Sequence, residues 1–348
     1  MRPAIKPNPN IENFVKTLKL EKVNSIHIAE LGIHPVIKEK ILGRKVTTLR
    51  DDIEFWYLAG YDYIKLQPKI QFDPGKVFIQ DHNMDNLQDN NINRNWAEEK
   101  RGVITSWEEL EKYQLPEKKD IDYSSFEEVK KYLPEGMGVI GQYGDIFTMV
   151  WRLMGFEQFC FALYDNPELI EELFEKIGNL VLSMFEYFAQ SDVVDVMWYS
   201  DDIAYATGLL ISPQSLKTYF FPWLKKIGDL AKLYNKPLIY HTDGKLFEVM
   251  EDIINSGVNA LHPIEPKAMD IVRVKEKYGN KLCLIGNIDV DLLSRSNPDK
   301  IRKNVRENIE KVWDNGGYIV GSGNSIPDYV KLENYIALIE EAKNYRLE

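Results

Sequence analysis

The sequence predicts an α/β protein built as a (β/α)8 TIM barrel, with a segment inserted after the second strand. Short apolar runs alternate along the chain with longer segments whose apolar residues recur at i, i+3, i+4 and i+7, the spacing of an amphipathic helix. Parallel strands need such helical crossovers between them. Eight apolar runs of strand length occur, and eight parallel strands close a (β/α)8 barrel.

The expected strands are distributed along the whole chain. They lie at residues 25–30, 61–67, 137–142, 193–199, 237–241, 259–264, 281–287 and 317–322. Two intervening helices have clear starts. Asn166 and Asn297 each precede a proline and then an acidic residue, which suits the first turn of a helix.

Residues 70–134 interrupt the alternation of strands and helices. They contain a polar tract, the apolar stretches 76–81 and 102–105, and a helical pattern near 124–133. We interpret 70–134 as an insertion with a short hairpin and a helix that caps one end of the barrel. No Gly/Ser/Pro-rich linker and no fixed-period repeat divides the chain, so a single domain spanning 1–348 is expected.

The composition is ordinary for a soluble globular protein, with 44% hydrophobic and 28% charged residues. A cytoplasmic location is expected because the sequence shows neither a membrane span nor a signal peptide. No run approaches the roughly 18 uninterrupted apolar residues of a membrane span. The N-terminal MRPAIKPNPN lacks the apolar core of a signal peptide. A formal net charge of -11 argues against a nucleic-acid partner. Cys160 and Cys283 lie in apolar runs and are expected to be free core thiols.

Polar side chains stand at the end of nearly every expected strand. In a (β/α)8 barrel the active site forms at these C-terminal strand ends, because the eight βα loops converge there. The residues concerned are His27, Glu30, Gln67, Gln142, Asp145, Ser200, Asp201, Asp202, His241, Asp243, His262, Glu265, Asn287, Asp289, Ser322 and Asn324. We expect many of them to surround a substrate cavity.

His241 and Asp243 form the sharpest pair of this ring. Their i, i+2 spacing at a strand end points both side chains to the same side, so they can share a proton or a divalent metal such as zinc. Glu265, held between two prolines, is the expected third ligand. An acid-base pair without a metal suits the same residues. Asp243 could also act only as the N-cap of the following helix.

Asp202 and six further residues are expected to take part in catalysis or substrate binding. The Asp201-Asp202 doublet puts charge where packing would prefer none, although Asp202 could also cap a helix. Asp289 could be a helix cap and Asn324 a left-handed turn residue, whereas His262 suits a core or supporting position. The expected substrate contacts are Gln142, Asp145, Tyr199, Asn287, Asp289 and Asn324. Aromatic residues that could form an apolar wall are Trp198, Tyr199, Tyr205, Phe220, Phe221 and Trp223, about half of them expected to be core.

Several segments together resemble the uroporphyrinogen decarboxylase superfamily. They are HTDG at 241–244, GNIDVDLL at 286–293, GGYIVGSGNSIP at 316–327, ENYIALIEEA at 333–342 and the stretch 198–227. The resemblance covers nearly the whole chain and implies a (β/α)8 barrel. Heme-pathway decarboxylases of this family carry Arg-Gln-X-Gly-Arg after the first strand to grip a polycarboxylate. Here 29–35 reads AELGIHP, without arginine, so uroporphyrinogen decarboxylation is the disfavoured alternative.

The other branch of the superfamily implies a methyltransferase whose methyl acceptor is cobalamin on a partner corrinoid protein. Members that act on thiols hold zinc with His-X-Cys and a later cysteine, and here Asp243 and Asn324 replace both thiolates. Oxygen and nitrogen ligands favour polarising an oxygen, so the resemblance points to a small O-methyl donor. A non-catalytic ligand-binding barrel is a further alternative. Homodimers are common in the family, and no stretch indicates a pairing surface.

Overall fold

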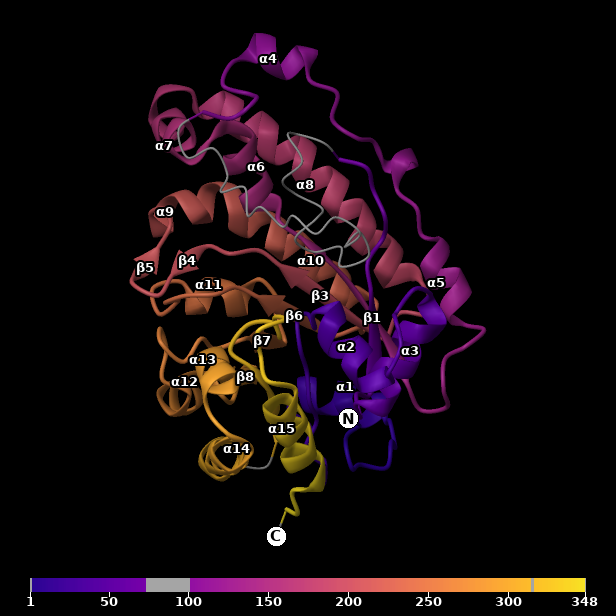
Figure 1. Ribbon diagram of the computed structural model, residues 1–348. Coiled ribbons are helices and arrows are strands. Elements are labelled where there is room, and N and C mark those ends of the chain that lie inside the picture. The colour runs from indigo at the N-terminus through magenta and orange to yellow at the C-terminus, as the bar shows by residue number, and fades with distance from the viewer. Residues whose placement is uncertain (1, 73–100, 314–315, 348) are drawn as a thin grey trace.

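A curled parallel sheet of seven strands forms the centre of the molecule (Figure 1). The computed structural model describes residues 2–72, 101–313 and 316–347. The strands are β1 Tyr63–Leu66, β2 Gly138–Gly144, β3 Val196–Ser200, β6 Leu238–His241, β7 Ala260–His262, β8 Cys283–Ile288 and β9 Tyr318–Ser322. They pair in that order and every pairing is parallel. Seven of the predicted strands are thereby confirmed.

The remaining predicted strand, 25–30, is not part of this sheet as a strand. It makes one isolated parallel bridge, from Ile28 to Val320 of β9. Toward β1 its contacts involve side chains: His27 Nδ1 lies 2.7 Å from Asp62 Oδ2, and the Glu30 backbone N–H donates to the Tyr63 hydroxyl at 3.1 Å. The prediction of eight strands was therefore wrong for 25–30, because side-chain hydrogen bonds replace backbone pairing between this segment and β1.

Helices connect the strands and cover the outer face of the sheet (Figure 1). They are α1 Ile11–Leu18, α2 Pro35–Leu42, α3 Leu49–Leu58, α4 Trp107–Lys112, α5 Ser124–Val129, α6 Ile146–Met154, α7 Phe156–Asp165, α8 Pro167–Gln190, α9 Pro213–Ser215, α10 Phe221–Leu233, α11 Met250–Asn255, α12 Ile271–Tyr278, α13 Val290–Arg295, α14 Pro298–Val312 and α15 Leu332–Asn344. A π-helical turn at Leu216–Phe220 precedes α10, and β4 Ala204–Tyr205 pairs with β5 Gly208–Leu209. The predicted starts of α8 and α14 are confirmed.

Close packing of the outer helices depends on one glycine of α8. A Cβ at Gly178 would lie 2.4 Å from the indole of Trp223 on α10, so only glycine lets these two helices approach so closely. The inner side of the same layer is apolar, with the rings of Phe185 on α8 and Tyr199 on β3 at 5.8 Å. The layer fixes the orientation of β3, one of the strands that carry the candidate site.

The segment predicted as a cap, 70–134, is described in part. Lys69 pairs with Asp122 in an antiparallel bridge, and α5 occupies the place of the helix predicted near 124–133. Residues 73–100 lie outside the described residues, and the predicted hairpin falls partly among them. The capping role of this segment stays a prediction.

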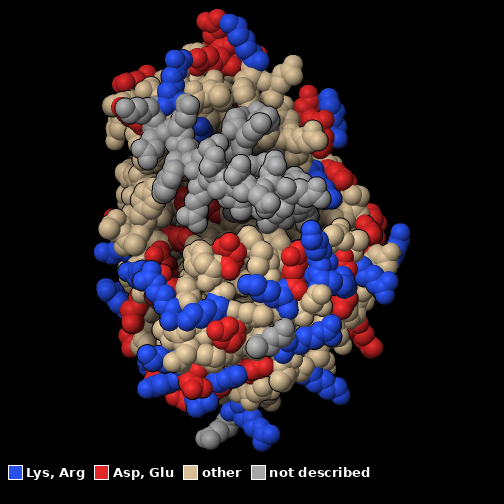
Figure 2. Space-filling model, in the orientation of Figure 1, with Lys and Arg blue, Asp and Glu red and all other residues tan. Residues whose placement is uncertain are grey.

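The two chain ends lie close to each other, away from the candidate site. Both chain ends lie at the lower end of the molecule in Figure 1, where the Ala4 backbone N–H donates to Glu340 Oε1 on α15 at 2.6 Å. Acidic and basic side chains intermingle over the lower half of the face in Figure 2. Among the described helices no single one is long and apolar enough to cross a membrane. Only α6 and α7 taken together have that length and apolarity, and the pair is bent by 94°.

Candidate metal and substrate site

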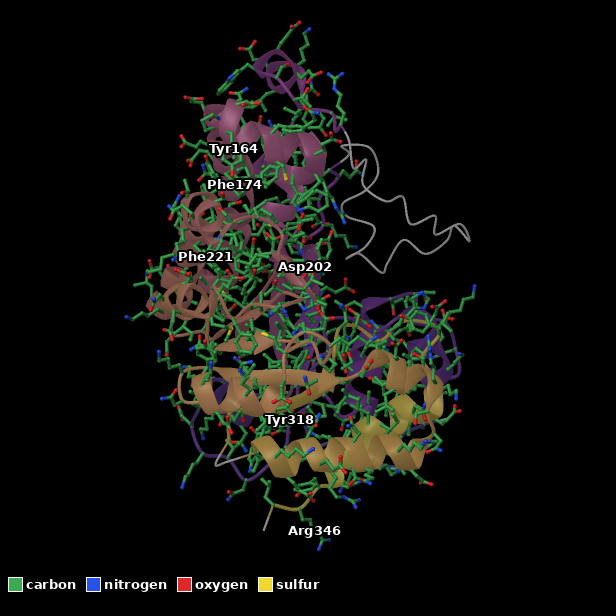
Figure 3. All side chains as sticks on the ribbon, turned by 90° about the vertical axis from the view of Figure 1, so that its left-hand side faces the viewer. Tyr164, Phe174, Asp202, Phe221, Tyr318 and Arg346 are labelled. Atoms are coloured by element: carbon green, nitrogen blue, oxygen red, sulfur yellow. The ribbon has the colours of Figure 1, made fainter. Side chains whose placement is uncertain are left out.

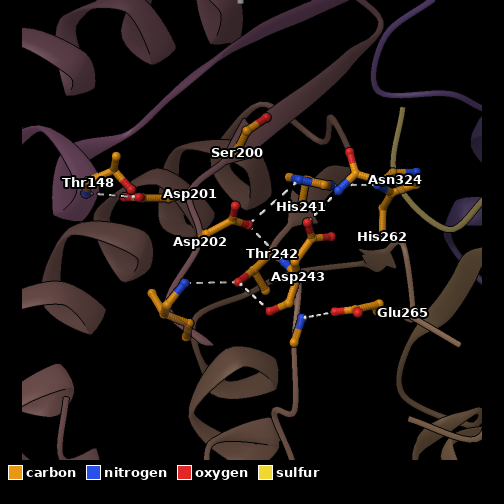
Figure 4. Close-up of polar contacts among 12 residues, drawn as sticks. Thr148, Ser200, Asp201, Asp202, His241, Thr242, Asp243, His262, Glu265 and Asn324 are labelled. Carbon is orange, nitrogen blue, oxygen red and sulfur yellow. Dashed lines mark hydrogen bonds and ion pairs between the residues drawn. The ribbon is translucent and has the colours of Figure 1, made fainter. Parts of the chain in front are cut away.

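Three parallel strands bring the chemically interesting side chains to one level. In the sheet register Ser200 of β3 pairs with His241 of β6, and His241 pairs with His262 of β7. Residues paired across parallel strands point to the same face, so both imidazoles lie on the inner face of the sheet. The chain continues from these strand ends into the loops that carry Asp202 and Asp243 (Figure 4).

Asp202, His241 and Asp243 form a compact group. Asp202 Oδ1 lies 3.7 Å from His241 Nε2 and accepts a 2.8 Å hydrogen bond from the Asp243 backbone N–H. One ligand atom from each of the three residues lies within 4.8 Å of the other two. The Asp202 side chain is 49% exposed and that of His241 only 6%, so the group is open to solvent on the Asp202 side. Figure 3 shows Asp202 near the middle of the molecule.

Two further carboxylates, Asp202 and Glu265, act electrostatically on Asp243. Burial, followed by the charges of Asp202 and Glu265, raises the pKa of Asp243 to about 8, although a hydrogen bond from Asn324 opposes the shift. Asp243 Oδ1 is buried and has no hydrogen-bond partner among the described residues. A divalent cation would satisfy this oxygen and offset the repulsion, so the three residues suit a metal with nitrogen and oxygen ligands.

The two histidines share a hydrogen bond that restricts their tautomers. His241 Nδ1 lies 2.7 Å from His262 Nδ1, so one of these nitrogens must donate. If His241 Nε2 is to offer a lone pair to a metal, its Nδ1–H donates to His262, and the hydrogen of His262 then sits on Nε2. Burial holds the pKa of His262 well below its ordinary value, which keeps His262 neutral in this role.

Glu265, predicted as a metal ligand, has a different place. Its Oε2 accepts a 2.9 Å hydrogen bond from the Gly244 backbone N–H, and it is not part of the three-residue group of ligand atoms. Gly244 has φ +91°, and a Cβ there would lie 2.6 Å from the Ala204 backbone. Glu265 therefore holds the loop after β6, and Asp202 replaces it as the third candidate ligand.

Asn324 contacts Asp243 directly. Its Nδ2 donates to Asp243 Oδ2, and its Oδ1 accepts a 2.7 Å hydrogen bond from the Ser325 backbone N–H. The Ser322 hydroxyl lies 3.0 Å from the Asn324 backbone oxygen and 2.5 Å from Glu30 Oε2. The loop after β9 thus orients the Asp243 carboxylate, and it is itself tied to the segment 25–30.

Tyr199 is the clearest departure from the predicted substrate contacts. Side chains alternate between the two faces of a strand, and Tyr199 faces the helices while Trp198 and Ser200 face inward. The Tyr199 hydroxyl donates to Asp201 Oδ2 at 2.7 Å, and this carboxylate accepts from the backbone N–H of Phe147 at the start of α6 at 2.6 Å. Tyr199 and Asp201 thus join β3 to a helix start.

Phe220, expected as part of an apolar wall, also packs in the outer layer. Its ring lies 6.2 Å from that of Tyr199 and 6.1 Å from that of Tyr240. Tyr205, by contrast, is 67% exposed. Of the predicted aromatic wall, Trp198 is the member that the sheet register places on the inner face with His241.

The other predicted substrate contacts lie at strand ends but have structural partners. Asp289 Oδ1 caps α13 by accepting from the Asp291 backbone N–H at 2.7 Å, so the capping alternative describes it. Asn287 Nδ2 donates to the Ile264 backbone oxygen at 2.5 Å. Asp145 follows β2 in a left-handed conformation, φ +67°, directly before α6. Gln142 faces inward, where its Nε2 donates to Ser200 Oγ at 2.9 Å.

Comparison with known proteins shows where this fold and chain belong. The model of the family described as uroporphyrinogen decarboxylase (URO-D) matches residues 99–345, more than half of the chain. The chain belongs to the URO-D family. It is 23% identical over 248 residues to uroporphyrinogen decarboxylase of Ruthia magnifica subsp. Calyptogena magnifica, covering 68% of this chain and 69% of that protein. It is 25% identical over 180 residues to the uroporphyrinogen decarboxylase of Trichodesmium erythraeum, and this match covers 51% of this chain and 48% of that protein.

The structure of this URO-D family member resembles that of a methyltransferase. A methyltransferase from Methanosarcina mazei superposes with a TM-score of 0.68 at 17% identity, over 96% of this chain and 98% of the other. At this identity the likeness establishes a shared fold. The match of the family model confirms the family predicted from the sequence.

One inward-facing residue of this URO-D family member escaped the sequence interpretation. Lys65 lies on β1, and its ammonium nitrogen is 5.4 Å from the centre of the Trp198 ring. The available signal was a lysine within the apolar run YIKL, where a charge is costly unless it has a partner.

Proposed function

We propose that this protein transfers a methyl group from a small O-methyl compound to the cobalamin of a partner corrinoid protein. In this proposal His241, Asp202 and Asp243 hold zinc or a comparable divalent ion. The observation that carries it is the group of nitrogen and oxygen ligands at the strand ends, with an Asp243 oxygen that has no partner among the described residues and with the carboxylates of Asp202 and Glu265 nearby. A bound ion would supply Lewis acidity toward the ether oxygen, which helps an alkoxide or phenoxide to leave.

Each side chain near the ligands has a distinct part in this proposal. His262 fixes the tautomer of His241 by accepting its Nδ1–H. Asn324 orients Asp243, and Glu265 holds the loop between β6 and α11 through Gly244. The absence of thiolates makes the site harder than one built to activate a thiol, which supports an oxygen-bound methyl group. The segment 25–30 lies between β9 and β1, which it contacts through one bridge and through side chains.

The proposal is tested by methyl loading of cob(I)alamin. Purified protein supplemented with zinc is incubated with cob(I)alamin and a panel of methoxylated compounds, and methylcobalamin is followed by its absorbance. We expect formation from at least one donor and loss of it in His241→Ala. If no donor yields methylcobalamin with the metal-loaded protein, the proposed transfer is wrong.

A decarboxylase is the second candidate, because the sequence relatives are named uroporphyrinogen decarboxylases. The segment 29–35 offers no arginine for a polycarboxylate, which weighs against it. Release of CO₂ from uroporphyrinogen, with no methylcobalamin in the parallel assay, would favour this candidate. Ligand binding without either product would favour a non-catalytic barrel.

A further inference from the structure

Lys65 faces the same interior as the candidate metal ligands. It pairs with Ile140 in the sheet register, and Ile140 pairs with Val196. Trp198 lies two residues beyond Val196 and therefore points to the same face. The register from β3 through β6 then carries that face to His241.

A continuous row of contacts connects the Lys65 ammonium with His241. The ammonium nitrogen lies 5.4 Å from the Trp198 ring centre, and the Trp198 ring lies 5.2 Å from the His262 ring. His262 Nδ1 is 2.7 Å from His241 Nδ1. Two side chains thus separate a positive charge from a candidate metal ligand, a separation that suits a small molecule with two different polar ends.

Lys65 makes no ion pair or hydrogen bond with a carboxylate among the described residues. Lys38, by contrast, pairs with Asp52 at 2.5 Å. Glu30 Oε1 accepts from the Ser322 backbone N–H, and burial raises the pKa of Glu30 to about 8, so it is largely neutral at pH 7. Lys65 is half-buried. Burial lowers its pKa to about 7, so Lys65 is about half protonated at pH 7, and a bound anion would favour its ammonium form.

Two further donors of this interior lack partners within the described part of the chain. Trp198 Nε1 and His262 Nε2 are buried and make no hydrogen bond there. Trp198 Nε1 always carries a hydrogen, and His262 Nε2 carries one in the tautomer that leaves His241 Nε2 free. An ammonium and two unpartnered N–H groups together form a set that recognises an anion.

We propose that Lys65 and Trp198 bind a carboxylate of the substrate, which makes the substrate a small methoxylated carboxylic acid. This inference rests on the proposed methyl transfer and specifies its substrate class. The carboxylate lies toward β1, and the methoxy group lies toward His241 and Asp243. Lys65 positions the donor and takes no part in the transfer itself.

Direct binding measurements test this inference without cobalamin. Isothermal titration of the full-length, zinc-supplemented protein uses two matched pairs, 4-methoxybenzoate with 4-methoxybenzamide and methoxyacetate with methoxyacetamide. We expect at least one acid to bind about tenfold or more tightly than its amide, because a charge-assisted hydrogen bond distinguishes them. Lys65→Met should abolish the preference, and Lys65→Arg should keep most of it.

Lys226→Met is the matched control, because it removes an exposed lysine that also lies over a tryptophan, 3.5 Å from the Trp223 ring centre. It should leave the preference unchanged. The inference is overturned if neither acid is preferred by the wild type, or if a folded Lys65→Met variant keeps the preference. A Lys65-dependent preference without methylcobalamin formation would leave the anion site standing and reject the proposed transfer.

Discussion

Asp243 and its neighbours show how single residues make a metal site recognisable. A carboxylate with a buried, unpartnered oxygen lies beside two further carboxylates, Asp202 and Glu265, and beside an imidazole whose second nitrogen is already bonded. Like charges gathered in a partly buried place cost free energy unless a cation or a proton joins them. The elevated pKa of Asp243 and the clustering of ligand atoms from Asp202, His241 and Asp243 within 4.8 Å of one another fit such a site.

His262 offers a test at the scale of one residue. Its Nδ1 accepts from His241 in the tautomer that suits metal binding, and His262→Phe removes this acceptor while keeping a flat ring. We expect the zinc affinity to fall about 10- to 100-fold, as for other partners of metal-bound histidines. Competition with a chromophoric chelator measures it.

His262→Asn serves as the conservative comparison. Its side-chain oxygen can replace the Nδ1 acceptor, so most of the zinc affinity should remain. Equal affinity in the wild type and in both variants would show that this hydrogen bond does not orient His241.

At the scale of elements, the segment 25–30 is tied to β9 through a buried carboxyl group. The Ser322 hydroxyl has one hydrogen but lies close to both Glu30 Oε2 and the Asn324 backbone oxygen. A protonated Glu30 resolves this, because its O–H donates to Ser322 Oγ and the serine hydroxyl donates to Asn324. Burial, the largest influence on this group, raises the pKa of Glu30 to about 8, in agreement with this arrangement.

The raised pKa of Glu30 predicts a pH-dependent stability. Between pH 4.5 and pH 8 the folded chain holds a proton on Glu30 that the unfolded chain releases, so this group's contribution falls as pH rises. Glu30→Gln mimics the protonated form, so its unfolding free energy should not fall with rising pH through this group. Urea unfolding at pH 6 and pH 8 should show the variant gaining about 2 kcal/mol relative to the wild type over this interval.

The exposed Glu21 provides the control for this experiment. Glu21→Gln makes the same chemical change at the surface and should leave the pH dependence of the unfolding free energy as in the wild type. An unchanged difference between Glu30→Gln and the wild type at the two pH values would mean that Glu30 is ionised in the folded protein.

At the scale of the whole molecule, periodicity predicts the sheet better than it predicts the site. Seven strands follow from apolar runs between amphipathic helices, whereas 25–30 makes a single bridge because side chains occupy its other side. The His241 and Asp243 pairing follows from their i, i+2 spacing at a strand end. Tyr199 was misplaced because a shift of one residue exchanges the faces of a strand.

Glu265 and Lys65 show what sequence spacing does not contain. The direction of Glu265 depends on a loop whose path is set by close backbone contacts of Gly244. The proposed anion site at Lys65 depends on N–H groups of Trp198 and His262 that lack partners among the described residues. These groups come together only when β1, β3 and β7 assemble into the sheet. Strands can be predicted from the local sequence pattern, whereas the charged and polar groups that meet in the interior come from distant parts of the chain.

Metal content is the measurement that tests the central claim most directly. Mass spectrometry of purified protein after supplementation with zinc, cobalt, nickel or iron should find about one bound ion per chain. The double variant Asp202→Asn with Asp243→Asn should lose most of it. Asp229→Asn with Asp299→Asn, which removes two charges from exposed positions of α10 and α14, should retain it. A wild-type protein that binds none of these ions, or a folded Asp202/Asp243 double variant that binds as much as the wild type, would contradict the account.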